Sequence, residues 1–245
     1  MKVFLCPSPE LYQLYHRPEA IVIITDIFRA STTMVTALAN GAAGILPVAT
    51  VEETQALGLA KGYLMAAERQ VRRCDFAHFG NDPLEYTPEA VSEQRIVLTT
   101  TNGTRSLRIA LEASAKQILV GSFINLPQTI DYCHRLGSTE VVIVAAGWQG
   151  QVCAEDCLYA GAFATLAEKQ GLGVAQGDMA VMMRDLWREH CQTLEARMKY
   201  IKCSEHYARL VHAGHADAAE YCMTIGSHDL VVGLVDTHEG WLGRL

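Results

Sequence analysis

Short apolar segments rich in β-branched residues recur along the first two thirds of the chain, and stretches of helical character separate them. Continuous apolar runs of this length are typical of strands that are covered on both faces. Their alternation with helices predicts a mostly parallel sheet with helices on both sides. The expected strands are 2–6, 20–25, 44–49, 63–67, 95–99, 117–121 and 140–146, and the expected helices are 31–40, 51–61, 104–114, 126–136 and 155–170.

The last third of the chain has a different character. Residues 178–224 contain no clear strand, so the segment at about 176–225 is expected to be a helical elaboration. The segment 229–235, DLVVGLV, predicts a closing strand. No linker rich in Pro, Gly or Ser interrupts the chain and no internal repeat is visible, so residues 1–245 are expected to form a single domain.

Composition narrows the classes of partner. Half of the residues are hydrophobic, which excludes general disorder, and the formal charge of −7 disfavours nucleic acid and anionic membranes as main partners. No window of 18 uninterrupted apolar residues is present, so no membrane span is expected. Eight cysteines in 245 residues are too sparse for a disulfide-rich secreted domain, and free thiols in the cytoplasm are the expected state.

Chemically useful side chains gather where the expected strands end. Asp26 and Glu68 each follow one strand, the run TTTNGT (99–104) follows a third, and Glu155 and Asp156 lie beyond a fourth. Ligands of open α/β sheets bind at the carboxyl ends of the strands. These four segments are therefore expected to converge on one site.

Four acidic residues stand in these segments, namely Asp26, Glu68, Glu155 and Asp156. Carboxylate oxygens suit Mg²⁺, and an ion shared between them and a substrate phosphate would hold a charged ester for hydrolysis. Acidic residues in the first turn of a helix also stabilise the helix dipole, which is the alternative explanation for Glu155 and Asp156.

The same segments contain groups that suit an anion. Asn102, Gly103 and Thr104 predict a turn and a helix start whose N–H groups can seat a phosphate, and Thr32 lies at a similar helix start. Arg29 can bind phosphate or carboxylate oxygens through two N–H groups. Taken singly, each of these residues is explained equally well as a helix cap or an ion-pair partner.

Other patterns do not indicate chemistry. Cys191 and Cys203 each begin a Cys-x5-Arg spacing, but helix-forming residues replace the glycine-rich loop that a thiolate phosphatase needs. A zinc site at Cys153 and Cys157 is not expected, because no second ligand pair stands nearby in the sequence. Among the later histidines, packing or surface roles are the default, and His206 is the one singled out. No phosphate-loop or dinucleotide-binding motif appears.

Together the motifs resemble the 2-phosphosulfolactate phosphatase family, the ComB-like proteins of coenzyme M biosynthesis. The resemblance spans almost the whole chain. The matching stretches are DIFRASTTMVTAL (26–38), AAERQVRRCDFAHFGNDPLEY (66–86), TTTNGTRSL (99–107), GSFIN (121–125) and AGWQGQVCAEDCLYAGA (146–162).

This resemblance implies a three-layer α/β/α fold with a mostly parallel or mixed sheet, and a Mg²⁺-dependent phosphatase. The implied substrates are phosphate monoesters of 2-hydroxycarboxylic acids, with 2-phosphosulfolactate giving sulfolactate and phosphate. A homodimer is a further expectation. The catalytic candidates are Asp26, Arg29, Glu68 and Asp156; the metal candidates are Asp26, Glu68, Glu155 and Asp156; and the substrate-binding candidates are Thr32, Asn81, Asn102, Gly103 and Thr104.

Some positions depart from the usual family pattern. Ala67, Gln70 and Asp82 stand where the family usually has a glycine, an asparagine and a serine, which leaves the identity of the hydroxyacid open. Two alternatives to the sulfolactate activity therefore remain. One is a phosphatase for a different hydroxyacid phosphate, and the other is a non-catalytic binder of a small phosphorylated or sulfonated acid.

Overall fold

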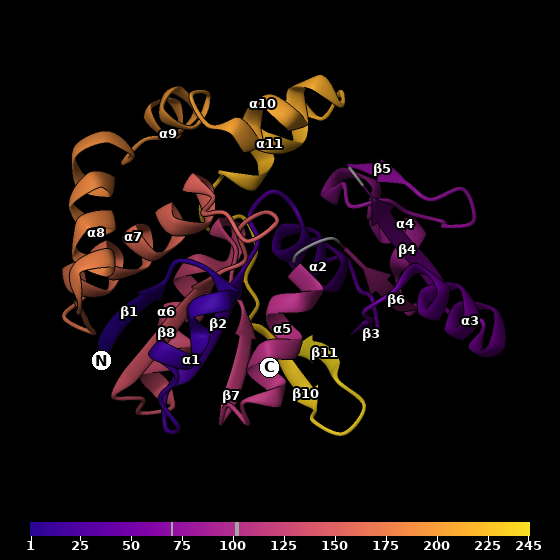
Figure 1. The fold of residues 1–245 in the computed structure, drawn as a ribbon, viewed down its shortest axis with the longest axis horizontal. Coiled ribbons are helices and arrows are strands. Elements are labelled where there is room, and N and C mark those ends of the chain that lie inside the picture. The colour runs from indigo at the N-terminus through magenta and orange to yellow at the C-terminus, as the bar shows by residue number, and fades with distance from the viewer. Residues whose placement is uncertain (70, 101–102) are drawn as a thin grey trace.

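A mixed eleven-stranded sheet forms the centre of the fold (Figure 1). The computed structural model describes residues 1–69, 71–100 and 103–245. The strand order is β5-β4-β6-β3-β11-β10-β7-β2-β8-β1-β9. The strands are β1 (Lys2–Cys6), β2 (Ile21–Thr25), β3 (Gly44–Pro47), β4 (Leu64–Arg69), β5 (Arg72–Arg73), β6 (Arg95–Thr99), β7 (Gln117–Val120), β8 (Glu140–Ala145), β9 (Val174–Ala175), β10 (Val232–Asp236) and β11 (Trp241–Arg244).

Helices cover both faces of this sheet, and the predicted α/β fold is confirmed. The helices α8 to α10, orange in Figure 1, follow the last long parallel strand and form the predicted helical C-terminal elaboration. The helices are α1 (Tyr12–Tyr15), α2 (Ala30–Ala39), α3 (Val51–Lys61), α4 (Pro88–Val91), α5 (Gly103–Glu112), α6 (Leu126–Arg135), α7 (Ala154–Lys169), α8 (Asp178–His190), α9 (Leu194–Ile201), α10 (Glu205–His212) and α11 (Ala216–Cys222), with 3-10 turns at Pro9–Leu11, Pro83–Glu85 and Phe123–Asn125.

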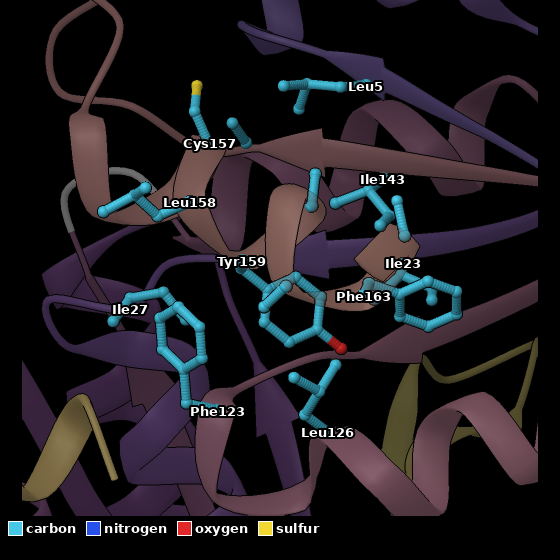
Figure 2. Packing of buried hydrophobic residues seen from close by; sticks show 14 of the residues in the cluster. Leu5, Ile23, Ile27, Phe123, Leu126, Ile143, Cys157, Leu158, Tyr159 and Phe163 are labelled. Carbon is cyan, nitrogen blue, oxygen red and sulfur yellow. The ribbon is translucent and has the colours of Figure 1, made fainter. Parts of the chain in front are cut away.

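Alternating residues of the central strands pack into two separate hydrophobic cores, one on each face of the sheet. Ile23 and Ile143 point to the face covered by α6, α7 and α8, whereas Val22 and Val142 point to the face covered by α2 and α5. Side chains alternate in this way because successive residues of a strand face opposite sides of the sheet. Figure 2 shows Tyr159 of α7 packed in the first core. The helices α8 to α11 contribute to that same core.

Two groups of parallel strands make up the sheet, and a C-terminal hairpin joins them. The first group is β9, β1, β8, β2 and β7, and the second is β3, β6 and β4. β10 pairs antiparallel with β7 and β11, and β11 pairs antiparallel with β3. Because three antiparallel pairings separate the groups, their strands run in opposite senses along the sheet.

The sheet is therefore mixed, in agreement with the expected fold, and the strands of the two groups do not end at one common edge. Neighbouring strands in a sheet are rotated by roughly 20–25°. The four steps from β2 to β3 therefore turn the second group by roughly a right angle, which allows segments from both groups to meet. They do meet, since residues that follow β2, β6 and β8 line one cavity together with a residue of β4.

The predicted long elements are present, with shifts of a few residues at their ends. β4 continues through Arg69, so Glu68 lies inside a strand and not after it; the antiparallel pairing of Glu68 with Arg73 extends the strand. The closing strand begins at Val232, and β11, β9 and β5 had not been predicted. None of the helices in the described part of the chain combines the length and apolar character that crossing a bilayer requires.

Candidate active site

A small cavity of about 30 Å³ lies where the two strand groups meet. This is the space of about one water molecule. Segments following β2, β6 and β8 contribute to its wall together with Glu68 of β4, so the structure brings these segments close to one another. Its polar residues are Asp26, Arg29, Glu68, Asn81, Thr100 and His206, and its apolar residues are Phe28, Val71, Trp148 and Leu210.

Asp26 is held at the end of β2 by the start of α2. Its carboxylate accepts a hydrogen bond from the Ala30 N–H at 3.3 Å, and its own N–H donates to Ser31 Oγ at 2.7 Å. Burial raises the pKa of Asp26 to about 6, and the charges of Glu155 and Glu68 act in the same direction. His206 and the Ala30 N–H oppose this shift. A carboxylate ionised at such a cost is suited to a bound cation.

Two cavity oxygens have no hydrogen-bond partner among the described residues. They are Asn81 Oδ1 and Thr100 Oγ1, and both are buried. Glu68 is also buried, and one of its oxygens accepts a hydrogen bond from the Val71 N–H at 2.5 Å. Buried polar atoms are normally paired, so unpaired ones beside a cavity indicate a ligand that completes them. Asp26, Glu68 and Asn81 together offer the oxygen donors that fit Mg²⁺.

Arg29 places a positively charged side chain in the wall of the cavity. Its side chain is almost fully buried, and its guanidinium donates to Asp82 Oδ2 at 3.1 Å. The same oxygen lies 2.7 Å from His215 Nδ1. Asp82 stands just before the 3-10 turn Pro83–Glu85, where its other oxygen accepts a hydrogen bond from the Leu84 N–H. Arg29 is thereby fixed in orientation with part of its charge compensated.

Asp156 does not line this cavity. Its two carboxylate oxygens accept hydrogen bonds from the N–H groups of Ile27 at 2.7 Å and Gly147 at 3.0 Å. Burial raises the pKa of Asp156 well above its usual value, and the charges of Glu155 and Asp26 add to the effect. Asp156 therefore ties together the segments that follow β2 and β8, which holds Asp26 in place. Its predicted catalytic and metal roles stay predictions.

Glu155 lies behind the cavity with no exposed surface. Its Oε1 is 2.5 Å from Nδ1 of His206, which comes from α10 and does line the cavity. The other oxygen, Oε2, has no hydrogen-bond partner in the described part of the chain. Glu155 thus orients His206 and keeps one oxygen available.

The predicted substrate-binding threonines lie outside the cavity wall. Thr32 Oγ1 donates to the Ile27 carbonyl at 3.1 Å and lies 2.8 Å from Ser122 Oγ, so it links α2 to the segment after β7. Thr104 Oγ1 donates to the Thr100 carbonyl at 3.1 Å and lines a neighbouring pocket. Asn102 lies outside the described residues, and Gly103 is the first residue of α5.

The neighbouring pocket has a volume of about 580 Å³ and shares Thr100 with the cavity. Arg69, Arg105 and Arg108 line it. Arg105 pairs with Glu10 and Arg108 with Glu112, whereas Arg69 donates hydrogen bonds to two neutral groups, the Glu68 carbonyl and the Thr99 hydroxyl. The pocket therefore adjoins the cavity with cationic side chains on its wall.

Comparison with known proteins decides the family. A family model described as 2-phosphosulpholactate phosphatase matches residues 6–237. The chain belongs to the 2-phosphosulfolactate phosphatase family. This confirms the resemblance seen in the motifs and places the chain in a family of phosphoric monoester hydrolases.

Curated relatives agree over most of their length, and each of the following is called a probable 2-phosphosulfolactate phosphatase. The protein from Thermotoga maritima is 35% identical over 215 residues, which cover 87% of this chain and 88% of the relative. The one from Caldanaerobacter subterraneus is 33% identical over 218 residues and 87% of each chain. The one from Synechocystis sp. is 30% identical over 228 residues, 91% of this chain and 92% of the relative.

Sequence reasoning did not find several parts of this family member's site. Asp82 had been noted only as a departure from the family pattern, yet it is the partner of Arg29. Trp148 and Leu210 line the cavity, although nothing in their sequence context marks them. His206 had been singled out, but its partner Glu155 is 51 residues away in sequence, a separation that no local pattern reveals.

Proposed function

We propose that the protein is a Mg²⁺-dependent phosphatase for phosphate monoesters of 2-hydroxycarboxylic acids, with 2-phosphosulfolactate as the favoured substrate and sulfolactate and phosphate as products. The observation that carries the proposal is the cavity of this family member, which Asp26, Glu68 and Asn81 line together with Arg29. Oxygen donors and a guanidinium around one small space suit a cation and a phosphoryl group held side by side.

Mg²⁺ would be held by Asp26 and Glu68, with the unpaired Asn81 Oδ1 as a neutral third oxygen. When bound, it would neutralise negative charge on the phosphoryl group. Glu155 and Asp156, the other two predicted ligands, lie behind Asp26 and shape its surroundings. Asp26 is also the candidate nucleophile if the reaction forms a covalent intermediate.

The remaining polar residues bind and orient the ester. Arg29 donates hydrogen bonds to phosphoryl oxygens, and its fixed position stabilises the charge that develops during transfer. Thr100 Oγ1 has no partner among the described residues and supplies a further donor. Trp148 and Leu210 limit the access of bulk water.

The cavity is small, about 30 Å³, so only the phosphoryl group of the substrate can approach the cation there, and the acid part must lie outside it. We assign that part to the neighbouring pocket, where Arg69 has the charge to bind a carboxylate or sulfonate. A place in coenzyme M biosynthesis, a cytoplasmic location and a homodimer belong to the same proposal as expectations; the eight free thiols support a reducing compartment.

The test is phosphate release from a panel of phosphate monoesters, with Mg²⁺ and with EDTA. The panel contains 2-phosphosulfolactate, 2-phospholactate, and simple alkyl phosphates that lack the 2-carboxylate. We expect Mg²⁺-dependent release from the hydroxyacid esters and much slower release from the alkyl phosphates. No release from any ester with Mg²⁺ present would contradict the proposal, and tight binding without release would favour the non-catalytic alternative.

A further inference from the structure

A second group of possible metal ligands lies directly behind the cavity. Cys153 stands at the N-cap of α7, Glu155 is in the first turn of that helix, and His206 comes from α10. Their ligand atoms all lie within 4.8 Å of one another, and all three residues are buried. The fold therefore places a thiol, a carboxylate and an imidazole together, although the histidine is 53 residues from the cysteine in sequence.

Glu155 gives an independent sign that a ligand belongs here. The residue has no exposed surface, and only Oε1 is satisfied, by His206 Nδ1 at 2.5 Å. Oε2 is buried with no hydrogen-bond partner among the described residues. Leaving a carboxylate oxygen buried and unpaired is costly, and a bound cation removes that cost.

The chemistry of the three donors selects the kind of cation. Mg²⁺ takes oxygen ligands and has little affinity for sulfur, whereas thiolate and imidazole suit Zn²⁺ and its close relatives. Three protein ligands with a fourth position open is the arrangement of zinc sites that bind a further molecule. His206 also lines the cavity, so the open position can face it.

We propose that Cys153, Glu155 and His206 bind a transition-metal dication of the Zn²⁺ class, at a site separate from the oxygen-lined cavity. Binding releases the thiol proton of Cys153 to solvent, places the imidazole proton of His206 on Nε2 so that Nδ1 is the nitrogen ligand in place of its contact with Glu155 Oε1, and uses Glu155 Oε2 as the oxygen ligand. The site goes beyond the proposed phosphatase reaction and does not depend on it, because the donors alone define it. The proposal also differs from the expectation that no zinc site lies at Cys153, because His206 of α10 provides the imidazole that was not visible nearby in the sequence.

The experiment titrates the full-length, EDTA-treated protein with Co²⁺ as a spectroscopic substitute for Zn²⁺. We expect one equivalent of Co²⁺ to saturate a thiolate-to-cobalt charge-transfer band and the intense visible bands of four-coordinate cobalt, whereas cobalt that enters the oxygen-lined cavity gives no thiolate band. One equivalent of Zn²⁺ should abolish these bands, and excess Mg²⁺ should not. No thiolate band in the wild-type protein, or displacement of cobalt by Mg²⁺, would overturn the proposal.

Variants locate the ligands. Cys153→Ser and His206→Gln should lose the charge-transfer band or the four-coordinate spectrum, respectively. The matched controls are Cys157→Ser, a buried thiol one turn further along α7, and Cys203→Ser, an exposed thiol; both should keep the full spectrum. A band that survives in Cys153→Ser would overturn the assignment.

X-ray absorption of the zinc-loaded wild-type protein needs no variant and covers the case in which a substitution prevents folding. We expect one sulfur at about 2.3 Å and nitrogen or oxygen ligands at about 2.0–2.1 Å. A shell of oxygen and nitrogen alone would refute the site. Phosphatase activity plays no part in either measurement, so failure of this proposal and failure of the proposed function are distinguishable.

Discussion

At the scale of single residues, burial of the Asp26 carboxylate destabilises the folded protein by an amount that depends on pH. Its pKa rises from 3.8 to about 6 on folding, mainly because it is buried. A raised acid pKa means that the folded chain holds the proton more tightly than the unfolded chain does. Protonated Asp26 therefore makes its full contribution to the free energy of unfolding below about pH 4. This contribution is lost as the pH rises through about 6, which lowers the free energy of unfolding by on the order of 3 kcal/mol at neutral pH.

Asp26→Asn is therefore expected to stabilise the metal-free protein at pH 7.5. The amide has no charge to bury, and its oxygen still accepts the hydrogen bond from the Ala30 N–H. In EDTA the melting temperature should rise by roughly 6–12 °C at pH 7.5 and by roughly half as much at pH 5, where Asp26 has lost its proton in the unfolded chain but mostly keeps it in the folded one. Calorimetric scans at both pH values check this, and an unchanged or lower melting temperature at pH 7.5 would contradict the burial argument.

Asp82 compensates the buried charge of Arg29. Removing the Asp82 carboxylate is therefore expected to destabilise the protein, in contrast to Asp26→Asn. In Asp82→Asn the guanidinium is left without a counter-charge, so the free energy of unfolding should fall by about 3–5 kcal/mol. An anion in the cavity restores the missing charge. We therefore expect inorganic phosphate to raise the melting temperature of Asp82→Asn more than that of the wild-type protein.

Asp75→Asn is the matched control for this change, because Asp75 lies on the same connecting segment and is exposed. It should behave like the wild-type protein with and without phosphate. Equal effects of phosphate on Asp82→Asn and wild type would show that Asp82 does not hold the charge of Arg29.

At the scale of elements, the contact between α7 and α8 depends on a glycine. A Cβ built on Gly161 would lie 2.3 Å from the Met183 carbonyl oxygen of α8, a distance at which one of the helices must move. Glycine to alanine in an open helix position normally stabilises by about 1 kcal/mol. Here overpacking should reverse the sign, so Gly161→Ala is expected to lower the free energy of unfolding by about 1–3 kcal/mol.

Urea unfolding of Gly161→Ala measures this effect. The control is Leu59→Ala on α3, where the side chain is largely exposed and a change within about 0.5 kcal/mol is expected. A more stable Gly161→Ala protein would show that α7 and α8 are further apart than described.

The helices and strands that the sequence predicted correctly are those with strong local patterns. The segments 20–25 and 140–146 are continuous apolar runs, and 51–61 ends at Gly62 in the left-handed conformation. β11 was missed because GWLGRL contains two glycines and lacks an alternating pattern. Only its pairing with β10 and β3 makes it a strand, and pairing is not a local property.

At the scale of the whole molecule, the sequence predicted that the strand-end segments meet, but not how. Asp26, Arg29, Glu68 and Asn81 do lie around one cavity. The β10–β11 hairpin joins the two strand groups and reverses the direction of the second, and this arrangement depends on pairing between segments far apart in the sequence. The ion pair of Arg29 with Asp82 and the contact of Glu155 with His206 were unpredictable for the same reason, because each joins segments more than 50 residues apart.

The central claim is that this cavity is the active site of a phosphatase, and turnover by Asp26→Asn tests it most directly. Phosphate release from 2-phosphosulfolactate is measured with Mg²⁺ for the wild-type protein, Asp26→Asn and the exposed control Asp185→Asn, with substrate binding followed calorimetrically in parallel. We expect Asp26→Asn to lose roughly 10²-fold or more in turnover while still binding substrate, and Asp185→Asn to match the wild type. Wild-type turnover by Asp26→Asn would contradict the account.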